Sequence, residues 1–80
     1  MRIRSLFFAA YRDLVGAEEL ELELPDGATV AELTGLVRRR EGAGALPDAV
    51  VVAVNRRYAT PETTLSDGDE VAFIPPVAGG

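Results

Sequence analysis

The chain has 80 residues, 48% of them apolar, and a net charge of −5 from 13 acidic and 8 basic side chains. It contains no Cys, His, Trp or Lys, and every basic residue is Arg. This composition fits one small globular domain and excludes disulfides, a Cys-ligated zinc, an imidazole base and a catalytic lysine. The acidic balance argues against nucleic acid or an anionic membrane as partner, and no apolar run is long enough to span a bilayer. We therefore expect a cytoplasmic protein.

The first part of the chain predicts two strands that flank a short helix. Residues 3–10 form an apolar run typical of a buried strand, and residues 10–15 predict a short helix with Gly16 just past its end. Residues 19–24 alternate Glu with Leu, which predicts a strand with one face in water. Its charges would suit the edge of a sheet.

The main helix has a clear start signal. Thr29 and Glu32 have the spacing of a capping box, in which the first residue caps the helix and the second lies in its first turn. The apolar spacing that follows predicts a helix from Val30 through the three arginines at 38–40, with Gly42 as its terminator. Residues 43–47 are expected to form a loop.

The second half predicts three more strands. Residues 49–54 read as a second buried strand, residues 55–57 as a turn, and Tyr58-Ala59 as a short returning strand. A tight turn at 66–69 precedes the last strand at 70–74. The order predicts an α+β fold, a mixed sheet of four to five strands with one main helix packed on one face. The most apolar strands, the first and the last, are expected at its centre.

Strand alternation predicts which aromatic residues are buried. If Ile3, Phe7 and Phe73 face the helix, then Phe8 and Ile74 face outward, because successive side chains of a strand point to opposite faces. Large apolar side chains on an exposed face mark an interaction surface, and Tyr58 is a further candidate for it. The alternative is that Phe8 or Tyr58 simply covers a thin core.

The domain is expected to span residues 1–74 and to end in an extended, flexible tail, residues 75–80. Prolines at the root of the tail donate no backbone hydrogen bond, and terminal glycines leave the backbone open to close approach. Six extended residues reach roughly 20 Å and would carry an ionised carboxylate. The alternative is a frayed terminus without a role. The tail consists of Pro75, Pro76, Val77, Ala78, Gly79 and Gly80.

Three short motifs and the closing run carry a family resemblance. They are Leu6-Phe7-Phe8-Ala9, the run RDLVG at 12–16, Val54-Asn55, and LSDGDEVAFIPPVAGG at 65–80. With these motifs the chain resembles, from end to end, the small sulfur-carrying subunit of molybdopterin synthase, a ubiquitin-like β-grasp family.

The resemblance implies a specific chemistry at the C-terminus. A separate adenylating enzyme, similar to ubiquitin-activating enzymes, would use ATP to adenylate the carboxylate of Gly80, and a sulfur donor would convert it to a thiocarboxylate. The tail, with Gly79 as slender support, would then enter the large synthase subunit and deliver sulfur to cyclic pyranopterin monophosphate. The family assembly is a heterotetramer. The chain would hold no cofactor or metal and would not be a catalyst alone.

Two alternatives stay open at this point. A sibling carrier of thiazole synthesis, tRNA thiolation or protein conjugation would share the fold and the Gly-Gly end. A plain ubiquitin-like binding module would have an inert tail. Other charged groups suggest no site: the arginines at 38–40 fit a solvated helix end, and the acidic residues at 67–70 lack the spacing of a calcium loop.

Overall fold

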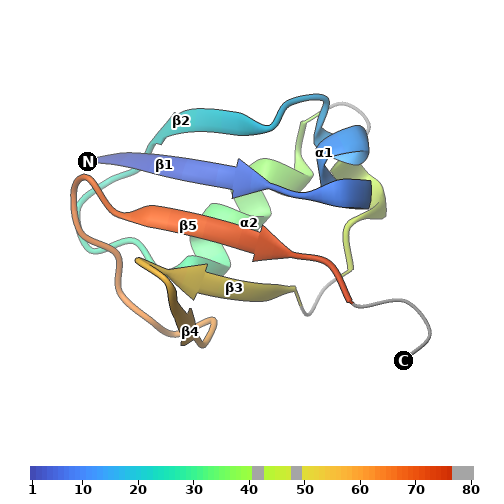
Figure 1. Cartoon of the computed structure of the whole chain (residues 1–80). Helices are drawn as coiled ribbons and strands as arrows, with labels where there is room; N and C mark the ends of the chain where they lie inside the picture. Colours follow the sequence, from blue (N-terminus) through green and yellow to red (C-terminus); the bar gives the residue numbers. More distant parts are fainter. Residues whose placement is uncertain (41–42, 48–49, 77–80) are drawn as a thin grey trace.

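A computed structural model describes residues 1–40, 43–47 and 50–76. It contains five strands, two α-helices and one short 3₁₀ helix (Figure 1). In chain order these are β1 (Arg2–Phe7), α1 (Ala9–Val15), β2 (Glu19–Glu23), α2 (Val30–Arg38), η1 (Ala43–Ala45), β3 (Val51–Val54), β4 (Arg57–Ala59) and β5 (Glu70–Ile74).

The five strands form one mixed sheet in the order β2-β1-β5-β3-β4. The first and last strands pair in parallel at its centre, and the other pairings are antiparallel (Figure 1). The Glu-rich strand β2 lies at one edge, where its glutamates are exposed and Leu20 and Leu22 are half-buried. The α+β fold, the central strands and the charged edge strand are confirmed.

Helix α2 lies behind the sheet and covers one of its faces (Figure 1). Against it, alternate residues of β1 and β5 form the centre of the core, where the rings of Phe7 and Phe73 stack with centroids 5.0 Å apart. These two residues are direct partners in the β1–β5 register. Ser5 is buried between Ile3 and Phe7, and its hydroxyl has no hydrogen-bond partner among the described residues. The predicted strand alternation is therefore confirmed for the buried face.

The start of α2 and the end of α1 follow the predicted signals. Thr29 caps α2, and its hydroxyl accepts a hydrogen bond from the backbone N–H of Glu32 at 3.4 Å. Gly16 ends α1 in the left-handed region, with φ 84° and an N–H bond to the carbonyl of Arg12. A residue with a Cβ would be strained at that φ, which explains a glycine there.

Several predicted boundaries need correction. Strand β1 ends at Phe7 rather than at residue 10, because Phe8 caps α1 and Ala9 already begins that helix. Helix α2 ends at Arg38, with Arg39 as its cap, and the expected terminator Gly42 lies outside the described residues. The predicted loop at 43–47 contains the turn η1.

Strand β3 also differs from its prediction as a buried strand. It begins at Val51, whose side chain is 52% exposed, whereas Val52 is 1% exposed. Of the other two residues predicted for it, Val50 precedes the strand and Ala49 lies outside the described residues. An apolar run without polar alternation does not show which of its residues face water.

Candidate functional site

The face of the sheet that α2 leaves uncovered carries an apolar patch over its central and β3–β4 strands. The register aligns four outward residues in one row across the sheet: Leu6 beside Ala72, Ala72 beside Ala53, and Ala53 beside Tyr58. Two small residues therefore lie between two large ones. Further along the strands, Val51 pairs with Ile74 on the same face, and Phe8 follows β1.

This arrangement creates a shallow hollow of about 370 Å³. Its floor is the alanine pair, because a methyl side chain rises less from the sheet than its large neighbours do. We call this the outer hollow, defined by Leu6, Phe8, Ala53, Arg56, Tyr58, Glu70, Ala72 and Ile74. A shallow apolar surface of this kind suits a side chain of a docking protein, whereas a metabolite site encloses most of its ligand.

The three residues predicted for partner binding all line the outer hollow. Phe8 is 49% exposed and Tyr58 is 79% exposed, while Ile74 is half-buried. The sequence analysis missed the other five lining residues, which are Leu6, Ala53, Arg56, Glu70 and Ala72. Their position depends on how β1, β3, β4 and β5 align with one another, and that alignment has no local signal in the sequence.

The other half of the same face is charged. Arg4 on β1 pairs with Glu19 on β2 at 3.0 Å and with Glu70 on β5 at 3.6 Å. Arg2 pairs with Glu23 at 3.2 Å. The hydrogen bond to Glu19, together with its charge, raises the pKa of the Arg4 guanidinium. These cations are therefore already paired with carboxylates of the same chain, whereas no described element covers the apolar half of the face.

The root of the predicted tail lies next to the outer hollow. Strand β5 ends at Ile74, and Pro75 and Pro76 follow without regular structure. The predicted tail residues Val77, Ala78, Gly79 and Gly80 lie outside the described residues.

Acidic residues of the turn before β5 have a structural role. Asp69 accepts hydrogen bonds from the amide of Asn55 at 2.9 Å and from the backbone N–H of Ser66 at 2.8 Å. Asp67 accepts one from the backbone of Arg2 at 2.7 Å. Within the described part of the chain, no group of side chains could hold a metal ion. Neither described α-helix is long and apolar enough to cross a membrane.

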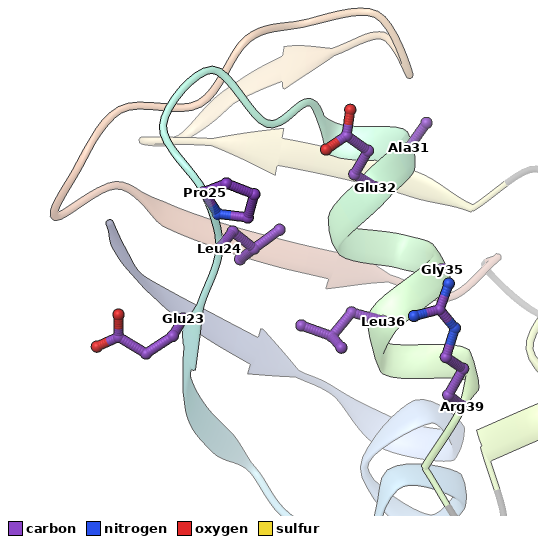
Figure 2. Close-up of a pocket in the computed structure, with 8 residues that line it drawn as sticks. All are labelled: Glu23, Leu24, Pro25, Ala31, Glu32, Gly35, Leu36 and Arg39. Atoms are coloured by element: carbon purple, nitrogen blue, oxygen red, sulfur yellow. The ribbon is translucent and has the colours of Figure 1, made fainter.

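A second hollow, of about 450 Å³, lies between α2 and the end of β2 (Figure 2). Glu23, Leu24 and Pro25 line one side, and residues of α2 line the other. At Gly35 an added Cβ would meet nothing within 4 Å, so this glycine is not required for packing within the chain. Ile74, from which the tail leaves the sheet, lines the outer hollow and not this second one, so we place the candidate site at the outer hollow.

Comparison with known proteins agrees with this architecture. The model of the ThiS family matches residues 5–80. The molybdopterin synthase sulfur carrier subunit of Escherichia coli (strain K12) is 42% identical, over 98% of this chain and 99% of that protein. The subunit of the same name from Chlamydomonas reinhardtii is 37% identical over the full length of both chains.

Solved structures share the fold over the whole chain. A Pyrococcus furiosus protein described as molybdopterin converting factor, subunit 1, superposes with a TM-score of 0.86 at 36% identity, covering 96% of this chain and 99% of that one. A complex of subunits 1 and 2 of the Helicobacter pylori molybdopterin-converting factor contains a chain with a TM-score of 0.74 at 25% identity, covering 100% of both. The β-grasp architecture is thus that of the relatives, and this chain belongs to the ThiS family.

Proposed function

We propose that this chain is the sulfur carrier subunit of a molybdopterin synthase and acts in molybdenum cofactor biosynthesis. The observation that carries the proposal is the full-length similarity to sulfur carrier subunits, up to 42% identity in the comparisons above. The uncovered apolar patch beside the root of the tail supports it, because a carrier must dock on other proteins while its end reaches into them.

The reactive group in this proposal is the carboxylate of Gly80. It attacks the α-phosphate of ATP in a separate adenylating enzyme, and pyrophosphate leaves. A sulfur nucleophile then attacks the acyl carbon and displaces AMP, which leaves a thiocarboxylate. The chain binds no cofactor itself, and ATP and the sulfur donor are used through the activating enzyme. Gly79 and Gly80 favour this route because no Cβ obstructs their entry into a narrow channel.

The large synthase subunit completes the reaction. The thiocarboxylate enters its active site and transfers sulfur to cyclic pyranopterin monophosphate, a substrate with a negative charge. This chain has a net charge of −5 and no Lys or His, so the cations and the acid–base groups come from the partner. In the proposed complex, Phe8, Tyr58 and Ile74 contact that partner, while Pro75, Pro76, Val77 and Ala78 extend the arm.

Intact-mass analysis tests the chemistry. After incubation with ATP, an adenylating enzyme and a sulfur donor, we expect the mass to rise by the difference between sulfur and oxygen, and to stay unchanged without ATP. A variant without Gly79 and Gly80 should bind the large subunit normally but take up no sulfur. An unchanged mass of the intact chain under complete conditions would refute the carrier function. Normal function of the shortened chain would instead indicate a binding module.

A further inference from the structure

An arginine at the rim of the outer hollow has an unusual backbone conformation. The two residues of the β3–β4 turn both have positive φ, 51° for Asn55 and 70° for Arg56. A two-residue turn of this kind matches the twist of a hairpin, and its usual sequence is Asn-Gly. Asn tolerates positive φ, but a long side chain such as Arg is disfavoured there. Strained positions of this kind tend to occur at functional sites, so Arg56 is a candidate functional residue.

The turn is fixed to the centre of the sheet by its first residue. The backbone N–H of Asn55 donates to the carbonyl of Glu70 at 2.7 Å, and its side-chain oxygen accepts from the N–H of Glu70 at 3.0 Å. Its side-chain amide donates to Asp69 at 2.9 Å. Three hydrogen bonds to the start of β5 therefore hold the backbone that presents Arg56.

Arg56 is exposed and has no ion pair with any residue in the described ranges. Glu70, the carboxylate at the rim of the outer hollow, is already paired with Arg4. By contrast, Arg2, Arg4 and Arg12 each pair with an acidic side chain. The charge of Arg56 is therefore available to a docking partner.

Arg56 and the root of the tail lie at opposite ends of β5. The turn is bonded to Glu70 at the start of β5, whereas the chain leaves the sheet after Ile74 at the other end of that strand. Four strand residues span about 13 Å. A group on a partner that contacts Arg56 therefore lies about that far from the point where the tail leaves the sheet.

We propose that Arg56 determines which partner docks on the outer hollow, by binding a carboxylate of the large synthase subunit beside an apolar side chain that enters the hollow. This inference rests on the proposed function. Since the whole chain has a charge of −5, it attracts basic surfaces in general. A partner that lacks an acidic group at this point would bury Arg56 without a counter-charge, which is costly. One cation beside an apolar hollow therefore selects among partners by requiring an acid there.

The test uses variants with opposite expected effects on stability and on binding. Arg56→Gly removes the charge and the strain together, so we expect a higher midpoint of urea unfolding and at least about tenfold weaker binding to the purified large subunit by calorimetry. Arg56→Asn, which also tolerates positive φ, should weaken binding similarly. Arg57→Gln is the matched control, because Arg57 alternates with Tyr58 on the strand and thus projects from the opposite face. Its affinity should stay within about twofold of the original chain, since it removes the same charge outside the docking surface.

The outcomes separate this inference from the proposed function. If the unmodified chain binds the large subunit and both Arg56 variants bind as tightly, the role of Arg56 is refuted while the carrier function stands. Equal weakening by Arg57→Gln would also refute it, since any nearby cation would then serve. If the unmodified chain neither binds the large subunit nor accepts sulfur, the proposed function itself fails. Thiocarboxylate formation, measured in parallel, should be unchanged by Arg56→Gly; a matching loss there would show that the residue serves the activating enzyme instead and would overturn the assignment.

Discussion

Phe7 and Phe8 are neighbours in the chain but belong to the two opposite faces of the sheet. Phe7 is 2% exposed and stacks on Phe73 under α2, whereas Phe8 is 49% exposed at the outer hollow. On the covered face, apolar side chains are buried by the chain's own helix. On the uncovered face, the charged half is paired internally, and no element in the described part of the chain covers the apolar half. The comparison shows that the chain's own helix covers one face of the sheet, whereas the other face is where we propose that a second protein docks.

The largest expected effect comes from a substitution on the face of the sheet that α2 covers. Phe73→Ala removes one ring of the buried stack and leaves a cavity, which costs about 3–5 kcal/mol of unfolding free energy. Since a small domain has a total stability of about 5–15 kcal/mol, the variant should be partly unfolded at 37 °C. Urea unfolding followed by circular dichroism measures the loss. A change below about 1 kcal/mol would show that the stack is not central to the core.

A smaller effect, on binding alone, is expected from a substitution on the uncovered face. Phe8→Asp places a charge in the docking surface and should weaken binding to the large subunit by about 2 kcal/mol, roughly 30-fold, while unfolding changes by less than about 0.5 kcal/mol. Calorimetry and urea unfolding measure the two quantities. Ala31→Asp, on the exposed surface of α2, introduces the same charge elsewhere and should leave binding unchanged. Loss of the fold in Phe8→Asp would place Phe8 in the core and contradict the division of the faces.

The smallest effect concerns a buried polar group on the face that α2 covers. The hydroxyl of Ser5 is buried without a hydrogen-bond partner among the described residues, although the side chain lies on the helix-covered face. Ser5→Ala removes that polar group, so we expect unfolding to become harder by about 1 kcal/mol. The affinity for the large subunit should not change. A loss of stability would mean that the hydroxyl is hydrogen-bonded in solution, for example to water.

Local patterns in the sequence predicted much of this division. Alternation along β1 and β5 placed Ile3, Phe7 and Phe73 inside, and the same alternation placed Phe8 outside. The Glu–Leu alternation of β2 predicted that one of its faces is exposed to water, and its charges predicted its position at the edge of the sheet. The capping residue Thr29 predicted where α2 begins.

Features that depend on pairing between distant strands were not predictable in this way. The outer hollow exists because Ala53 and Ala72 fall side by side, and no local rule fixes that register. Likewise, Asn55-Arg56 was recognised as a turn, but its attachment to Glu70 and its place at the hollow follow from the position of β5. Val51 was expected to be buried because an apolar run does not show which side a helix will cover. The end of β1 was placed too late because Ala9 and Ala10 are apolar yet favour helix.

The parallel pairing of β1 with β5 also affects how the protein matures. Arg4 on the first strand lies beside Glu70 on the last, so the centre of the sheet closes a loop that spans most of the chain, and such distant contacts form slowly. The outer hollow joins Leu6 and Phe8 from the start of the sequence to Ala72 and Ile74 near its end. A nascent chain still lacking β5 therefore has no docking surface. Under the proposed function, a partner that docks on this hollow therefore recognises only chains whose last strand has been synthesised and has joined the sheet.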